Sequence, residues 1–169
     1  MLIGFTGVGN AGKTTTATEM EKLGFKRIRE YISDLIPPEL RIIGKTYDDA
    51  EPFINAIEKL KEMHLTYEKS EKNIIFDRTI HDSLILSYLL LTDDAYEEYY
   101  NIHKKIEKRI RYDNLVFFEP VHLKNKLNGY EIMTEMLYHI KVRPKCDIIC
   151  EFDTVENRIN YILNKIGDK

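Results

Sequence analysis

The segment Gly7–Thr14 constrains the fold of this chain more than any other part of its sequence. It reads Gly-Val-Gly-Asn-Ala-Gly-Lys-Thr and satisfies the pattern G-x-x-x-x-G-K-[ST]. Glycines let successive backbone N–H groups turn inward around a phosphate, and a helix that begins near Lys13 adds its positive dipole end. Lys13 can reach the β- and γ-phosphates of ATP, and the Thr14 hydroxyl can coordinate Mg²⁺. We therefore expect an ATP and Mg²⁺ site formed by Gly7, Gly9, Asn10, Ala11, Gly12, Lys13, Thr14 and Thr15.

Short apolar runs alternate with helical periodicities along the rest of the chain. The runs predict strands at 2–5, 25–31, 73–76, 115–118 and 148–152. The periodic segments predict helices at 13–23, 51–72, 81–91, 96–112, 130–142 and 155–166, with a loop around 37–44. This alternation is typical of a three-layer α/β fold, a parallel sheet with helices on both faces. In such sheets ligands bind at the carboxyl ends of the strands.

Length and composition indicate a single globular domain over residues 1–169. The chain has 43% hydrophobic and 31% charged residues, as soluble domains do. Its net charge of -3 makes nucleic acid an unfavourable partner, and its apolar runs are too short to cross a membrane. We expect a cytoplasmic protein in which Cys146 and Cys150 are buried thiols. The five histidines show no metal-binding spacing, so we expect them on helix surfaces or in loops.

Charged residues follow two of the predicted strands at their carboxyl ends. Asp77 could hold the Mg²⁺ shell or accept a proton, and Arg78 could grip a phosphate. Arg29 and Glu30 offer another cation and another general base, although an exposed strand end would have the same residues. The sequence leaves open whether Asp77 or Glu30 is the base. We predict catalytic roles for Lys13, Asp77, Arg78 and Glu30, metal binding by Thr14 and Asp77, and substrate binding by Arg29, Glu30, Arg78 and Asp82.

A polar segment at about 120–143 has the character of a lid. Lys124, Lys126 and Arg143 could bring positive charge to a transferring phosphoryl group, and a solvated basic loop explains them equally well. Asp82 lies one helical turn beyond Arg78, where it could orient Arg78, contact substrate or cap the helix.

These motifs resemble the P-loop kinases of nucleosides and nucleotides over nearly the full chain. Thymidylate kinases place Arg-Glu after the second strand and Asp-Arg after the third, as this sequence places Arg29–Glu30 and Asp77–Arg78. The chain is still more similar to the small AAA-type ATPase and kinase domains that include nicotinamide riboside kinase. That resemblance rests on Asp82, Tyr112–Asp113, Glu119–Pro120, Asn128–Tyr130 and Glu156–Arg158.

The resemblance implies a P-loop NTPase fold with strand order 2-3-1-4-5 and a base-contacting loop near Asp153. The lid segment lacks the run of arginines typical of thymidylate kinases, so Lys124, Lys126 and Arg143 are its candidate substitutes.

Together these features predict an ATP-dependent phosphotransferase. Its expected acceptor is a small nucleoside or nucleoside monophosphate, such as a deoxynucleotide. One alternative is a nucleotide-dependent ATPase or switch module, and another is a kinase of nucleic-acid hydroxyl groups. GTPases read guanine with an Asn-Lys-x-Asp motif. This motif is not matched here, because the segment Asn125–Asn128 ends in Asn rather than Asp. The apolar helix at 81–91 could serve either the core or a homodimer.

Overall fold

The phosphate-binding loop joins the first strand of a parallel sheet to the first helix. The computed structural model describes residues 1–29, 32–42, 44–121 and 129–167. Its five strands run in the order β2-β3-β1-β4-β5, which confirms the predicted order. They are β1 (Leu2–Thr6), β2 (Lys26–Arg29), β3 (Ile74–Asp77), β4 (Asn114–Phe118) and β5 (Ile148–Cys150).

The three central strands are buried on both faces. Every residue of β1, β3 and β4 is buried, and all three strands are apolar runs, as parallel strands covered by helices usually are. In the parallel register Phe5 lies opposite Asp77, and Arg29 lies opposite Asp77 on the other side. The register therefore brings the end of β3 to the edge of the sheet where the phosphate-binding loop begins.

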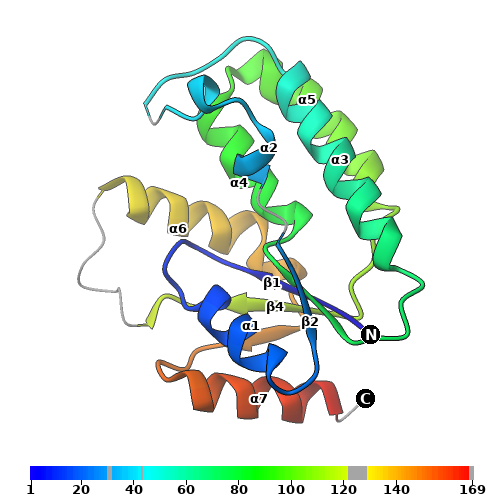
Figure 1. The fold of residues 1–169 in the computed structure, drawn as a ribbon. Coiled ribbons are helices and arrows are strands. Elements are labelled where there is room, and N and C mark those ends of the chain that lie inside the picture. The colour runs from blue at the N-terminus through cyan, green and yellow to red at the C-terminus, as the bar shows by residue number, and fades with distance from the viewer. Residues whose placement is uncertain (30–31, 43, 122–128, 168–169) are drawn as a thin grey trace.

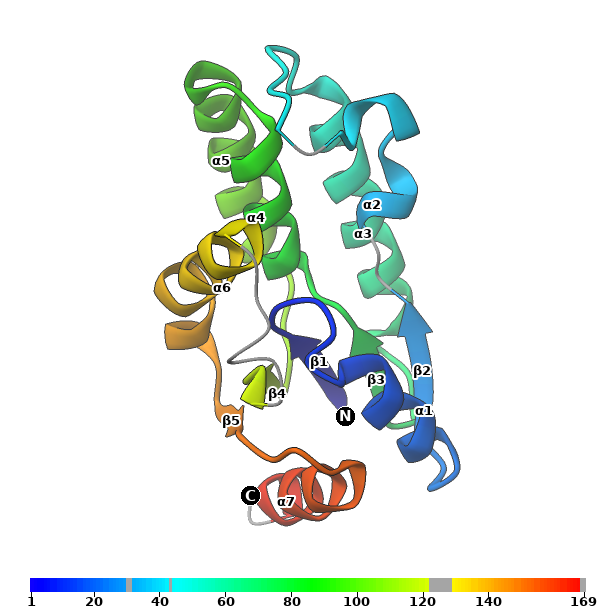
Figure 2. The same cartoon turned by 90° about the vertical axis from the view of Figure 1, so that its left-hand side faces the viewer.

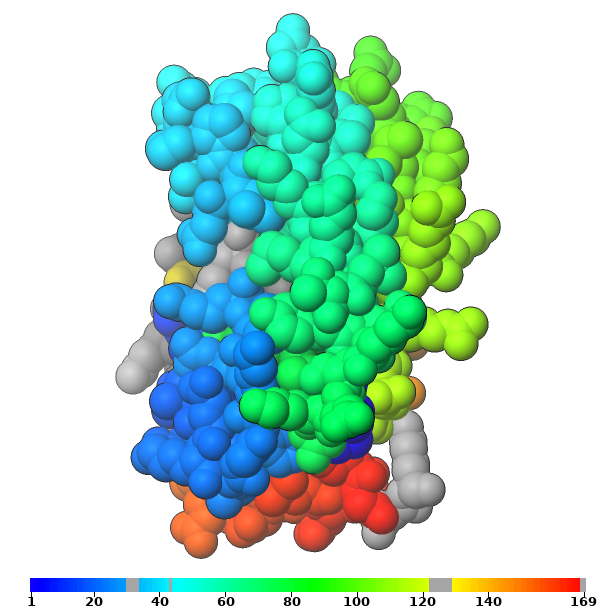
Figure 3. Space-filling model, turned by 45° about the vertical axis from the view of Figure 1, so that its right-hand side comes forward, coloured from blue at the N-terminus to red at the C-terminus, as the bar shows by residue number. Residues whose placement is uncertain are grey.

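Helices cover both faces of this sheet, so the structure has the predicted three layers (Figures 1 and 2). One face carries α1 (Lys13–Glu21) and α7 (Val155–Gly167), which contact each other. The other face carries α3 (Glu51–Tyr67), α4 (Ile80–Leu90), α5 (Asp93–Glu107) and α6 (Gly129–Lys141). Parts of α3, α4 and α5 rise beyond the carboxyl ends of the strands, and α3 forms a ridge along one face of the molecule (Figures 2 and 3). No helix in the described ranges combines the length and apolar character that crossing a membrane requires.

Short helices that the sequence pattern did not predict lie outside the predicted helices and strands. They are α2 (Ile32–Leu35) and the 3₁₀ helices η1 (Pro38–Leu40) and η3 (Arg143–Lys145). Two predicted helices also end too late. The helix predicted at 51–72 is α3, which ends at Tyr67, and the helix predicted at 96–112 is α5, which ends at Glu107. Segments this short contain too few turns to show a helical period, and terminal residues carry the weakest signal.

The apolar helix α4 lies in the interior of this chain. It begins with a capping box, in which Thr79 accepts a hydrogen bond from the helix backbone and Asp82 accepts one from the Thr79 N–H. Its buried residues pack with α3 and α5 in one cluster that contains Phe53, Leu84 and Tyr99. Packing within the chain therefore accounts for most of its apolar surface.

Three histidines are buried, which corrects the expectation that they lie on helix surfaces or in loops. His64 and His103 are fully buried, and His81 is nearly so. A ring nitrogen of His64 pairs with the carbonyl of Arg111 at 2.9 Å, and one of His103 pairs with the carbonyl of Ile80 at 3.1 Å. Burial lowers the pKa of His81 and of His103 to about 4.

The buried histidines make the stability of the fold depend on pH. Between the folded pKa of about 4 and the ordinary 6.5, the unfolded chain binds more protons at His81 and His103 than the folded chain does. We therefore expect the free energy of unfolding to fall by roughly 2 kcal/mol for each histidine between about pH 7 and about pH 5. Urea denaturation across this range measures the slope. His103→Gln should reduce the slope, and an unchanged slope would contradict this assignment.

Candidate functional site

The phosphate-binding loop has a backbone that depends on its glycines. Gly7 and Gly12 have φ of 128° and 90°, and Asn10 has φ of 58°. A Cβ at Gly7 would lie 2.6 Å from the carbonyl oxygen of Phe118, and one at Gly12 would lie 2.1 Å from Nη1 of Arg158. The loop is thus held between the end of β4 and helix α7, with no room for a side chain at either glycine.

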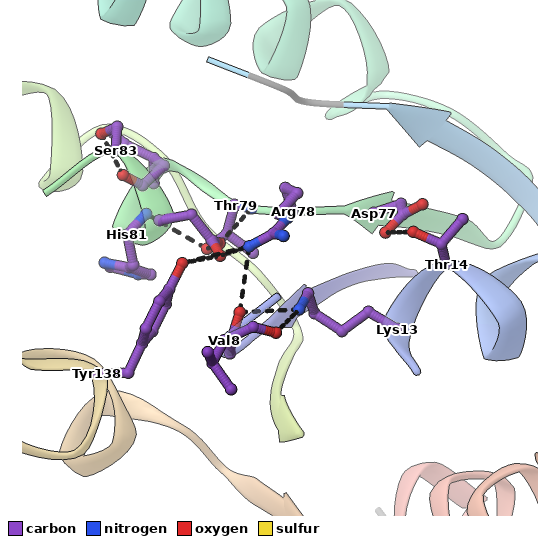
Figure 4. A network of polar contacts seen from close by, with 12 residues as sticks. Val8, Lys13, Thr14, Asp77, Arg78, Thr79, His81, Ser83 and Tyr138 are labelled. Atoms are coloured by element: carbon purple, nitrogen blue, oxygen red, sulfur yellow. Dashed lines mark hydrogen bonds and ion pairs between the residues drawn. The ribbon is translucent and has the colours of Figure 1, made fainter. Parts of the chain in front are cut away.

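Lys13 is buried and points back along this loop. Its Nζ donates to the carbonyls of Gly7 at 2.8 Å and of Val8 at 2.5 Å (Figure 4). Burial, and after it the nearby Arg78 guanidinium, lowers the pKa of Lys13 to about 7. A bound phosphate would favour the charged ammonium, because an opposite charge stabilises it. A cavity of ≈ 360 Å³ opens here, lined by Gly9, Asn10, Gly12, Lys13, Thr14, Thr15 and Arg78.

A hydroxyl and a carboxylate meet beside this cavity. Thr14 Oγ1 donates to Oδ1 of Asp77 at 3.1 Å, and Asp77 is fully buried at the end of β3 (Figure 4). The other carboxylate oxygen, Oδ2, has no hydrogen-bond donor among the described residues, and Arg27 Nε lies 3.8 Å from it. Mg²⁺ takes oxygen ligands of this kind, so the pair fits the predicted metal site.

Arg78 links the loop to two helices. It has φ of 93°, which is unusual for a residue with a side chain and marks a position held by its surroundings. Its Nη1 donates to Gly7 O at 3.1 Å, to Asp82 Oδ1 at 3.0 Å and to Tyr138 OH at 3.3 Å (Figure 4). The guanidinium is therefore fixed between the phosphate-binding loop, α4 and α6.

The sequence predicts Asp82 to orient Arg78, to contact substrate or to cap its helix. In the structure it both orients Arg78 and caps α4. Its Oδ2 accepts hydrogen bonds from the backbone and the hydroxyl of Thr79, and its Oδ1 accepts from Arg78 and from Tyr138 OH. Burial acts to raise the pKa of Asp82, but Arg78, Lys13 and these donors outweigh it and hold the pKa below its usual range. The carboxylate therefore stays charged beside two cations.

Among the remaining predicted residues, the structure describes Arg29 and Arg143. Arg29 is exposed at the end of β2, next to Asp77 in the register. Arg143 lies on η3, where Nε contacts Glu119 at 2.7 Å and Nη2 lies 3.7 Å from Glu151. Its role in a lid stays a prediction. Glu30, Lys124 and Lys126 lie outside the described residues.

Sequence reasoning missed three residues that surround the site. Arg27 approaches Asp77 from β2, and Tyr138 on α6 reaches Asp82 across 56 positions of sequence. Arg158 is buried against the loop at Gly12, and its Nε donates to the Phe152 carbonyl at 2.7 Å. Arg27 could have been found as the strand neighbour two positions before Arg29. Tyr138 carries no local signal, because tertiary packing alone brings it here. Arg158 belongs to the Glu156–Arg158 pattern of the family resemblance, but that pattern did not place it at the phosphate-binding loop.

A protein family described as an AAA domain matches residues 2–129. None of the curated proteins compared with the chain matches it.

Several solved structures, two of them kinases, share the fold of this chain. A deoxyadenosine kinase from M. mycoides, with products dCMP and a flexible dCDP bound, is 20% identical with a TM-score of 0.61, and 99% of each chain is covered. A thymidylate kinase from Candida albicans is 16% identical with a TM-score of 0.69, covering 99% of this chain and 91% of the other. The NadR protein in complex with NAD and AMP-PNP is 16% identical with a TM-score of 0.70, covering 99% of this chain and 50% of the other. At these identities the likeness establishes the fold alone.

The contact between Gly12 and Arg158 predicts unequal effects for two glycine substitutions in the loop. Gly12→Ala places a methyl group against a buried guanidinium at positive φ, so we expect it to lower the free energy of unfolding by about 1–3 kcal/mol. Gly9→Ala meets nothing within 4 Å and should stay within about 0.5 kcal/mol of the original chain. Urea denaturation compares the two. Equal stability of both variants would show that Arg158 does not confine the loop.

Proposed function

The chain belongs to the AAA domain family, and on that premise we propose that it is an ATP-dependent kinase of a small nucleoside or nucleoside monophosphate, such as a deoxynucleotide. One observation carries the proposal: Lys13, the Thr14–Asp77 pair and Arg78 converge on one cavity of ≈ 360 Å³ at the carboxyl edge of the sheet. The bound nucleotides of the deoxyadenosine kinase and the AMP-PNP of NadR support the same chemistry.

We assign the donor phosphates to the phosphate-binding loop. Its inward backbone N–H groups and Lys13 would hold the β- and γ-phosphates of ATP. Thr14 and Asp77 would hold Mg²⁺, directly or through water. When bound, Mg²⁺ supplies positive charge that neutralises these phosphates. Asp77 Oδ2 supports this assignment, because it is a buried carboxylate oxygen that has Arg27 Nε 3.8 Å away but no hydrogen-bond donor among the described residues, and a metal ion would satisfy it.

We assign the transferring group to Arg78. In the reaction an acceptor oxygen forms a bond to the γ-phosphorus while the bond to the ADP oxygen breaks. Negative charge develops on the transferring phosphoryl group during this step. Arg78 is already oriented by Asp82 and Tyr138, so its N–H groups can stabilise that charge without rearranging. A hydroxyl acceptor also loses a proton, for which Asp77 and Glu30 both remain candidates. A monophosphate acceptor needs no such base.

The proposal includes a location and a quaternary state. ATP and a small nucleotide acceptor are cytoplasmic metabolites, so we place the reaction in the cytoplasm.

A homodimer through α4 loses its sequence-based support, because α3 and α5 already cover most of the apolar surface of α4. The proposed partner of this site is therefore the small-molecule acceptor.

ADP release measured with a panel of acceptors tests the kinase proposal. The panel holds nucleosides, nucleoside monophosphates and nicotinamide riboside, each with ATP and Mg²⁺. We expect one acceptor class to raise the rate at least about tenfold over the protein alone, and Lys13→Ala to reduce that rate by about 100-fold or more, since it removes a charge from the transition state. Lys22→Ala is the matched control, because Lys22 is an exposed lysine that pairs with Glu19.

Each other outcome of this assay favours a different function. If no acceptor raises ADP release, the kinase proposal fails. Turnover of ATP alone that depends on Lys13 would instead favour an ATPase or switch module. Stimulation by oligonucleotides but not by monomers would favour a kinase of nucleic-acid hydroxyl groups.

A further inference from the structure

Three side chains with metal-binding atoms meet outside the phosphate-binding cavity. Glu119 directly follows β4, and Glu135 and His139 lie one turn apart on α6. One ligand atom from each lies within 4.8 Å of the other two. Within the described ranges, this is the sole group of three or more such side chains that meets this criterion.

The distances suit a small divalent ion with mixed ligands. His139 Nε2 lies 3.1 Å from Glu119 Oε2 and 3.8 Å from Glu135 Oε1. Two ligands of a tetrahedral zinc ion, each about 2.0–2.1 Å from the metal, lie roughly 3.3 Å apart. Residues four apart on a helix face the same side, so Glu135 and His139 can chelate one ion. A nitrogen with two carboxylate oxygens favours Zn²⁺ or a similar transition ion over Mg²⁺.

Glu119 is prepared for such a role by its surroundings. Its side chain is 9% exposed, and its second oxygen, Oε1, accepts a hydrogen bond from Arg143 Nε at 2.7 Å. Carboxylates that bind metals are commonly oriented in this way by a donor behind them. Arg143 also approaches Glu151, so its guanidinium is shared between two carboxylates. Glu119 and Glu135 bring two carboxylates to His139, and a divalent ion bound among them would neutralise their charge.

We propose that Glu119, Glu135 and His139 bind a divalent transition-metal ion of the zinc type, with solvent completing its coordination. The site is separate from the proposed Mg²⁺ position at Thr14 and Asp77 and does not depend on the kinase proposal. It joins the end of β4 to α6. Tyr138, the neighbour of His139 on α6, contacts Asp82 and Arg78. An ion here would therefore hold the helix that helps to orient Arg78.

Calorimetric titration of the full chain with Zn²⁺ tests this proposal. Millimolar Mg²⁺ is present throughout to occupy the site at the phosphate-binding loop. We expect one Zn²⁺ ion per chain and a higher melting temperature in its presence. His139→Gln and Glu135→Gln should each weaken the Zn²⁺ affinity at least about tenfold. Glu97→Gln, the same charge change at an exposed position of α5, should leave it unchanged.

Two results would overturn the proposal. The first is a chain that takes up no Zn²⁺ while circular dichroism shows it to be folded. The second is Zn²⁺ binding with equal affinity in the original chain, His139→Gln and Glu135→Gln, since the ion would then lie elsewhere, for example at Cys146. Co²⁺ provides a spectroscopic check, because its visible absorption bands report a nitrogen and oxygen ligand set. These bands should appear with the original chain and with Glu97→Gln and be lost with His139→Gln.

Discussion

The hydrogen bond between Thr14 and Asp77 joins the two strand-to-helix units on which the candidate site is built. Thr14 belongs to the first turn of α1, and Asp77 is the last residue of β3. They meet because β1 and β3 are parallel neighbours with Phe5 opposite Asp77, so both strands deliver their carboxyl ends to one edge. A sheet with another strand order would separate the phosphate-binding loop from this carboxylate.

Charge balance explains how so many ionisable groups are buried at this edge. Lys13 and Arg78 face Asp77 and Asp82, and each carboxylate is close to a cation or a donor. Such networks are stable only when nearly every member is satisfied. Here two groups remain incompletely satisfied: Lys13, whose pKa is lowered by burial, and Asp77 Oδ2, which has Arg27 Nε at 3.8 Å but no hydrogen-bond donor among the described residues. A phosphate and a metal ion are the groups that would complete them, which is why we interpret the site as one for a nucleotide with Mg²⁺.

The sequence predicted those parts of the structure that local patterns encode. The five strands, their alternation with helices and the loop at Gly7–Thr14 all leave a period or a motif, and the strand order followed from a family resemblance. It could not predict the burial of His64 and His103, because one ring nitrogen of each, Nε2, pairs with a carbonyl distant in sequence.

The same limit applies to the two sites. Tyr138 and Arg158 reach the phosphate-binding loop only through packing of α6 and α7. The spacing of Glu135 and His139 is visible in the sequence, but a search for histidine and cysteine pairs alone overlooks it, and the third group, Glu119, comes from another element.

Mass spectrometry of the reaction products tests the central claim most directly. The full chain is incubated with ATP, Mg²⁺ and a mixture of nucleosides and nucleoside monophosphates, and the small molecules are then identified. Our account predicts an acceptor that gains one phosphoryl group as ATP becomes ADP, and no such product with Lys13→Ala. Conversion of ATP to ADP and inorganic phosphate alone, with every acceptor unchanged, would contradict it.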